Sequence, residues 1–236
     1  MSTAIQALAS RIKKLSREEL LSLSPEDAAA IDYTLKDARC AEEVASFEAG
    51  PLYWLTNHTK TENPQYEDMG VPFLAPFPTK SYFVPLFEAF MKKSRQLYIC
   101  KSRSLMTSWS AAGYAAWLAQ YRQQEVLIQC QSQEKAEHIV DYVHQLWQNQ
   151  EPWLKERHPL ERASMLTVQW KGGGEVAGIP TGSDKVRAYH ASLYILDEAS
   201  FVPEGEECIN AVLPSGARVI AISTASPGWF AEACTL

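Results

Sequence analysis

The sequence lacks any long hydrophobic run. Across 236 residues it contains no uninterrupted apolar stretch of about 18 residues, the length that a membrane-spanning helix requires. Residues 1–14 have no apolar centre of the signal-peptide type and favour a short amphipathic helix. We therefore expect no membrane partner.

Metal-binding and disulfide patterns are also scarce. The five cysteines are odd in number, widely scattered and not spaced as zinc ligands. The five histidines form no pair of the metal-binding type. Reduced, mostly structural thiols in a cytosolic compartment are expected. The sequence contains neither an internal repeat nor a low-complexity segment.

Positive charge is in deficit, because the net charge is −6. A domain that wraps DNA non-specifically is usually basic, since phosphate neutralisation dominates its affinity. The balance argues against a tight DNA binder acting as an isolated unit. It leaves open a local basic strip, or DNA contact shared among several subunits. The composition, 46% hydrophobic and 21% charged, is that of an ordinary globular protein.

The first 80 residues differ in pattern from the rest. Residues 1–50 favour short helices, because Ser16 and Glu19 have capping-box spacing and Ser24 precedes Pro25. Residues 51–80 contain five prolines and predict an irregular connector that carries aromatic side chains. We place the boundary between an N-terminal helical extension and the main domain, 51–236, at residue 50.

Strand and helix patterns alternate through the main domain. A helix over 82–92 precedes them, and the spacing of glycines 172–174 predicts a hairpin between 165–170 and 175–179. The alternation predicts a doubly wound, mainly parallel α/β sheet. Strands are expected at 96–100, 125–130, 192–196 and 218–223, and helices at 108–122, 133–148 and 206–213.

Two adjacent carboxylates follow the apolar strand at 192–196. Asp197 and Glu198 stand where open α/β sheets bind their ligands, at the carboxyl end of a buried strand. In ATP-hydrolysing P-loop proteins this position holds a magnesium-binding aspartate, and a following carboxylate polarises the attacking water. Many buried strands also end in such a pair by chance.

A phosphate-binding loop must then lie between an earlier strand and helix. The candidate is the loop at 101–108, which ends with Ser108 where the standard motif has its serine or threonine. Both standard glycines and the standard lysine are missing. Backbone amides can still bind phosphate, with Lys101 or Arg103 as the cation. A strand–helix turn with two solvated cations fits the same residues. The loop comprises Lys101, Ser102, Arg103, Ser104, Leu105, Met106, Thr107 and Ser108.

The third element follows the strand at 218–223. Ser223, Thr224 and Ala225 bring small polar groups to the same sheet edge as Asp197. Hydroxyls there can report whether a γ-phosphate is present. A serine–threonine turn that simply closes a strand is the alternative.

In this order the three motifs resemble the ATPase domain of the large terminase subunit, the motor that packages double-stranded DNA into tailed-phage procapsids. The resemblance spans roughly 45–230, and large terminases often carry the loop lysine at the start of the loop, as Lys101 does. The segments that carry it are Lys-Ser-Arg-x-x-Met-x-Ser-Trp from Lys101, Leu-Asp-Glu-Ala from Leu196, Ile-Ser-Thr-Ala-x-Pro-Gly from Ile222, and the stretches 76–82 and 178–187.

The resemblance implies a P-loop fold of the additional-strand, catalytic-glutamate type, with ATP and Mg²⁺ as cofactors. Ser108 and Asp197 would hold magnesium, and Glu198 would orient and deprotonate water. The loop residues and the segment 223–225 would contact or sense phosphate. Arg187 matches a family arginine finger that reaches a neighbouring subunit, although a surface ion pair is its plainer role. The aromatic segment 77–82 resembles an adenine-contact region, and core packing is the favoured explanation.

The implied partners are double-stranded DNA, the portal protein and the small terminase subunit. The implied assembly is a homo-oligomeric ring, a pentamer, docked transiently on the procapsid in the host cytoplasm. No nuclease activity is expected, because too little chain follows Asp197 for the family's nuclease domain. Two alternatives stay open: a helicase-like nucleic-acid translocase, and a degenerate nucleotide-binding scaffold that does not hydrolyse ATP.

Overall fold

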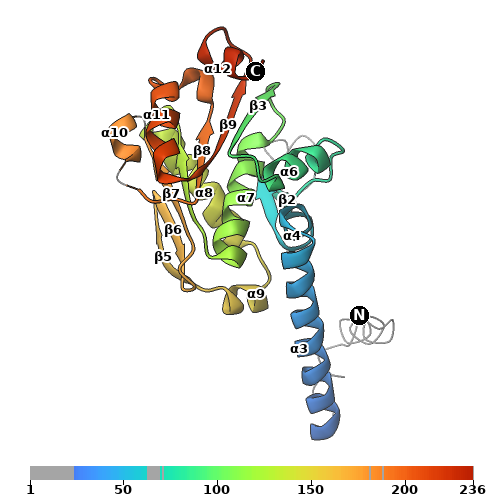
Figure 1. Ribbon diagram of the computed structural model, residues 1–236. Coiled ribbons are helices and arrows are strands. Elements are labelled where there is room, and N and C mark those ends of the chain that lie inside the picture. Colours follow the sequence, from blue (N-terminus) through green and yellow to red (C-terminus); the bar gives the residue numbers. More distant parts are fainter. Residues whose placement is uncertain (1–23, 63–69, 71, 181, 188, 236) are drawn as a thin grey trace. The chain divides into compact units, whose positions relative to one another are not determined.

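The computed structural model describes residues 24–62, 70, 72–180, 182–187 and 189–235 (Figure 1). Contacts divide the chain into two compact units, Met1–Gly50 and Pro51–Leu236. In the first unit α3 (Pro25–Glu48) is one helix of 24 residues. It begins at Pro25, as predicted, but the expected break into short helices is wrong for this stretch, because no glycine or proline interrupts it. The predicted cap at Ser16 and the helix over 1–14 lie outside the described residues.

A seven-stranded sheet forms the centre of the second unit. Its parallel part confirms the predicted alternation, and β6 and β7 form the predicted hairpin. β5 was not predicted, because this charged and mostly exposed edge strand carries no hydrophobic alternation. The order across the sheet is β3 (Gln96–Lys101), β9 (Arg218–Thr224), β8 (Leu193–Asp197), β4 (Glu125–Gln129), β7 (Glu175–Ile179), β6 (Thr167–Trp170) and β5 (Leu160–Ser164).

Helices cover both faces of this sheet. Side chains of β4 alternate between the two layers: Val126 and Ile128 join one core cluster, and Leu127 joins the other. The first cluster contains residues of α7 (Thr107–Arg122) and α8 (Gln133–Gln148). The second contains residues of α10 (Ser183–Val186), η1 (Ala199–Phe201), α11 (Gly205–Val212) and α12 (Trp229–Ala233), and η2 (Leu213–Ser215) follows α11. The predicted doubly wound α/β class is confirmed.

One strand lies between the loop strand and the carboxylate strand. β9 pairs in parallel with β3 on one side and β8 on the other (Figure 1). In this register Lys101 lies opposite Thr224, and Asp197 lies opposite Ile222. The interposed strand is the additional strand of the predicted fold type. The ends of β3, β9 and β8 therefore meet at one edge of the sheet.

The segment 51–80 corrects the expected irregular connector. It contains α4 (Pro51–His58) and two short strands, β1 (Lys60–Glu62) and β2 (Leu74–Pro76), before α6 (Phe83–Met91). Trp54 and Leu55 of α4 are fully buried. Gly113 lets α7 approach α4 closely, because an added Cβ at this position would lie 2.7 Å from the Leu55 side chain. The prolines of this segment predicted an irregular connector, but Pro51 occupies the first helical position, where proline is favoured.

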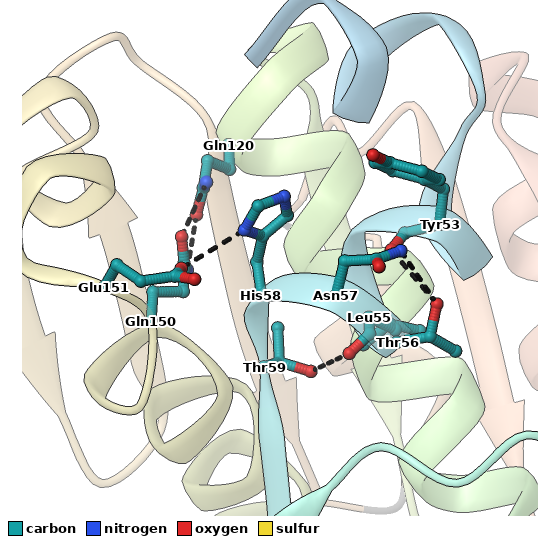
Figure 2. Close-up of polar contacts among 9 residues, drawn as sticks. All are labelled: Tyr53, Leu55, Thr56, Asn57, His58, Thr59, Gln120, Gln150 and Glu151. Carbon is teal, nitrogen blue, oxygen red and sulfur yellow. Dashed lines mark hydrogen bonds and ion pairs between the residues drawn. The ribbon is translucent and has the colours of Figure 1, made fainter. Parts of the chain in front are cut away.

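Buried and half-buried polar contacts fix α4 and α7 to the start of α9 (Pro152–Arg157) (Figure 2). The side chains of Gln120 and Gln150 exchange two hydrogen bonds, of 3.1 and 3.0 Å. His58 Nδ1 lies 3.2 Å from Glu151 Oε2. These contacts hold the helical layer that carries α7, and with it the candidate loop. Among the described residues no helix is long and apolar enough to cross a membrane.

Candidate functional site

Ser108 and Asp197 meet at the carboxyl edge of the sheet. Ser108, in the first turn of α7, donates its hydroxyl to Asp197 Oδ2 at 2.8 Å across 89 residues of sequence. Asp197 is only 4% exposed, and its Oδ1 has no hydrogen-bond partner among the described residues. Burial raises the pKa of Asp197, while the Ser108 hydroxyl and the Lys101 charge lower it. A buried carboxylate oxygen without a partner is an unusual and costly feature.

The loop before α7 adopts glycine-type turns without glycine. Ser104 and Met106 have positive φ angles of 62° and 52°. Met106 stands where the standard loop has its second glycine, so the left-handed backbone persists although the glycine does not. Such residues carry strain and gather at ligand-binding sites. Met106 is the N-cap of α7 and makes no side-chain cap bond, so the first amides of this 16-residue helix remain available to an anion.

A cavity of about 210 Å³ opens beside the Ser108–Asp197 pair. One side of the cavity is lined by four residues of α8, which we call the α8 stripe: Lys135, His138, Ile139 and Tyr142. Their i, i+3, i+4 and i+7 spacing places the four side chains on one helix face. Its lining residues are Ser108, Cys130, Lys135, His138, Ile139, Tyr142, Asp197 and Glu198. Burial raises the pKa of the Cys130 thiol, so this side chain stays protonated and uncharged at physiological pH.

Glu198 is held beside the cavity by an ion pair. Its backbone is left-handed, with φ 53° and ψ 40°, and its Oε2 contacts Lys135 Nζ. Sequence analysis missed Lys135. The available signal was its position three residues after the α8 N-cap Ser132, where a basic residue opposes the helix dipole.

The end of β9 is joined to the turn that follows Glu198. Ser223 is fully buried, and its hydroxyl accepts a 3.1 Å hydrogen bond from the Ser200 amide. The Ser200 hydroxyl donates to the Thr224 carbonyl at 3.2 Å. Ala225 follows and is exposed. Ser200 also escaped sequence analysis, because a serine in Asp-Glu-Ala-Ser carries no signal of its own.

Arg187 lies elsewhere. It ends α10, is largely exposed, and has its Nη1 3.6 Å from Asp184 Oδ1. It does not line the cavity beside Asp197; it lines a separate hollow of about 510 Å³ with Tyr189 and His190. A role in a neighbouring subunit's site stays a prediction.

The remaining candidates divide between loop and core. Lys101 is half-buried and close enough to influence Asp197, while Arg103 is exposed. Ser102 and Ser104 are also exposed, and Leu105 is half-buried. The expectation of core packing holds for Phe77, which is 2% exposed and lies 5.2 Å from the Phe83 ring.

The site fits a magnesium ion that completes its shell with water and phosphate. No group of three or more His, Cys, Asp or Glu side chains able to hold a metal occurs in the described part of the chain. Mg²⁺ prefers oxygen ligands and is usually bound through one or two protein groups plus substrate phosphates. The unpartnered Asp197 Oδ1 and the Ser108 hydroxyl supply that donor set.

Asp197→Asn should stabilise the ligand-free protein. The raised pKa means that ionised Asp197 opposes folding at neutral pH, so stability falls as the pH rises through the folded-state pKa. Removing the charge should raise the free energy of unfolding by about 1 kcal/mol, measured by denaturant unfolding. If ATP with Mg²⁺ stabilises the parent, the same variant should lose that stabilisation. A ligand-free variant less stable than the parent at pH 7, or equal to it, would contradict this.

Solved structures share this fold, although no protein-family model and no curated protein sequence matches the chain. The HK97 bacteriophage large terminase aligns over 73% of this chain, with 12% identity and a TM-score of 0.55. The chain has the fold of the aligned part of a large terminase. It spans 36% of the length of the HK97 terminase.

A second terminase structure is similar by a lower score. The Thermus phage P74-26 large terminase ATPase domain has 15% identity and a TM-score of 0.49, over 73% of each chain. The fold assignment therefore rests on the HK97 terminase, and it agrees with the resemblance that the sequence motifs carry.

Proposed function

We propose that this chain is the ATPase motor domain of a phage terminase large subunit, which hydrolyses ATP to translocate double-stranded DNA into procapsids. The observation that carries the proposal is the hydrogen bond from Ser108 to Asp197, whose Oδ1 has no partner among the described residues. Ser108 directly follows the loop in which Ser104 and Met106 have positive φ angles. The similarity of fold to the HK97 large terminase supports the same proposal. The strand order of this chain brings the parts of the site together.

ATP would lie over the start of α7. Amides of residues 102–107 and the helix N-terminus would bind its phosphates, with Lys101 as the main cation and Arg103 beside it. Mg²⁺ would be held by the Ser108 hydroxyl and Asp197 Oδ1. When bound, it neutralises charge on the β- and γ-phosphates.

Glu198 would accept the proton of the attacking water. The water oxygen bonds to the γ-phosphorus, the bond from that phosphorus to the β–γ bridging oxygen breaks, and ADP and inorganic phosphate leave. Positioning and electrostatics dominate such reactions. The left-handed backbone at Glu198 supports this role, since strain of this kind persists where the surrounding structure fixes a side chain.

Coupling to movement would pass through Ser200. Its two hydrogen bonds join the turn after Glu198 to Ser223 and Thr224, so a shift of Glu198 is transmitted to the end of β9. The motor would act as a homo-oligomeric ring, a pentamer, on the portal protein with the small terminase subunit. Its place would be the bacterial cytoplasm, docked on the procapsid, and Arg187 would complete a neighbour's site.

Lys101→Ala should weaken the binding of ATP with Mg²⁺ by about 10- to 100-fold, the value of a charge-assisted contact to phosphate. Arg103→Ala should weaken it less, because Arg103 is exposed and Lys101 is half-buried beside Asp197. Isothermal titration of the full chain measures both, with Lys93→Ala as the matched control, since exposed Lys93 precedes the amino end of β3. A parent chain that binds no ATP would favour the non-hydrolysing scaffold.

A further inference from the structure

Lys135 occupies a position that its own helix disfavours. It lies in the first turn of α8, and its amide donates to the N-cap Ser132 hydroxyl at 3.3 Å. Three residues after a serine cap, glutamate or glutamine is preferred, because the helix N-terminus carries partial positive charge. A lysine there is unfavourable for α8 alone. Its stabilising partners must come from outside the helix.

Those partners are Glu198 and Gln131. Lys135 Nζ contacts Glu198 Oε2 and donates to Gln131 Oε1 at 3.0 Å. The Lys135 and Glu198 side chains are 47% and 40% exposed, so the pair is partly hydrated and weak. A weak pair exchanges readily for a stronger anion. Lys135 therefore pairs with Glu198 weakly enough to exchange this partner for another anion.

The cavity beside Lys135 brings this one cation next to two carboxylates, Asp197 and Glu198. Lys135 is the one lysine or arginine among the described residues that line the cavity with Ser108 and Asp197. The Trp109 ring stacks on Tyr142 of α8, with centroids 3.9 Å apart. Since Trp109 follows Ser108, the stack fixes the α8 stripe relative to the loop. The N-terminus of α8 adds further positive potential.

Resting on the proposed function, we infer that Lys135 senses the terminal phosphate: it pairs with Glu198 when the site is empty or holds a diphosphate, and pairs with the terminal phosphate when a triphosphate binds. A terminal phosphate carries more negative charge than a carboxylate, so it outcompetes Glu198 for the ammonium. Glu198 is then released to face water. The exchange makes the site discriminate nucleoside triphosphates from diphosphates. It also keeps Glu198 from acting as a base until a triphosphate is bound.

The first test compares two nucleotides in the full chain with Mg²⁺. The probes are ADP and adenylyl imidodiphosphate, a non-hydrolysable ATP analogue, with affinity measured by isothermal titration. Lys135→Met should weaken the analogue by about 10- to 100-fold and ADP by less than about twofold, because only the analogue presents a terminal phosphate. Lys135→Arg should retain most of the discrimination. Lys93→Met removes the same charge near the opposite edge of the sheet and should change neither affinity.

A double-mutant cycle tests the pairing itself. Glu198→Gln removes the competitor and should tighten analogue binding by up to about fivefold, the range expected for a partly exposed ion pair. In the Lys135→Met background the same change should have no effect. ADP affinity should not respond in either background.

The outcomes separate the two proposals. Equal losses of affinity for ADP and for the analogue in Lys135→Met indicate a structural role and overturn the inference. A ratio of the two affinities that is unchanged from the parent likewise overturns it. An effect of Glu198→Gln that is the same in both backgrounds also overturns it. A parent chain that binds neither nucleotide overturns the proposed function as well, whereas a parent that binds and hydrolyses ATP leaves that function standing whatever Lys135 does.

Discussion

Glu198→Gln is expected to abolish steady-state ATP hydrolysis while leaving ATP bound. The amide keeps the shape of the side chain but cannot accept the proton of the attacking water. Loss of a general base lowers turnover by about 10²- to 10⁴-fold. Phosphate release by the full chain, measured in steady state and in a single turnover, gives the size of the effect, and the single turnover shows that chemistry rather than release has slowed.

Glu204→Gln is the matched control for this experiment. Glu204 is exposed, lies six residues away, and shares the left-handed backbone of Glu198, with φ 56° against 53°. The control removes one carboxylate from a similarly strained position outside the cavity, so turnover should persist. If Glu198→Gln turned over as fast as the parent, the water-activating role would be wrong.

Arg187→Ala is expected to lower hydrolysis by the assembled ring by about 10³- to 10⁵-fold, the contribution of an arginine finger. The guanidinium spreads the charge that develops on the transferred phosphoryl group. Arg187 does not line its own chain's cavity beside Asp197, so in the proposed mechanism it serves a neighbour's site. Hydrolysis is measured on procapsids with DNA, where the proposed ring would form.

Mixing provides the decisive version of this test. In the proposed mechanism, Arg187→Ala and Glu198→Gln chains should each be inactive alone, whereas a mixed ring would bring an intact Glu198 to an intact Arg187 of the next subunit. Mixed rings should therefore recover measurable hydrolysis. Asp184→Ala, which removes the 3.6 Å neighbour of Arg187, should keep activity. Mixed rings as inactive as their components would place the arginine in its own site or outside catalysis.

The sheet could be predicted from sequence because its strands are buried on both faces. The central parts of these strands, such as 126–128 and 193–196, are continuously apolar, and helix-period segments separate the strands, so the parallel topology follows. Two of the elements that were not predicted show why prediction failed there. α4 begins with Pro51 in a proline-rich stretch, and β5 is held by pairing with β6 rather than by a pattern of its own.

The site was predictable in its residue types and less so in its contacts. Strand ends placed Ser108 and Asp197 at one edge, and the structure joins them by a hydrogen bond; their roles stay predictions. The turns at Ser104 and Met106 could not be foreseen, because side chains other than glycine rarely adopt them. Lys135 meets Glu198 across 63 residues of sequence, and only the packing of α8 brings them together.

The absence of glycine from the segment 102–106 has a thermodynamic consequence. Glycine samples many backbone conformations, and a ligand must freeze them when it binds. Met106 and its neighbours sample fewer, so most of the ordering is completed at folding. The loop then loses less conformational entropy when nucleotide binds, whereas the backbone strain in the turn lowers the stability of the folded protein at all times. Under the proposed function, such a rigid loop would exchange ADP for ATP without re-forming its backbone turns in each cycle.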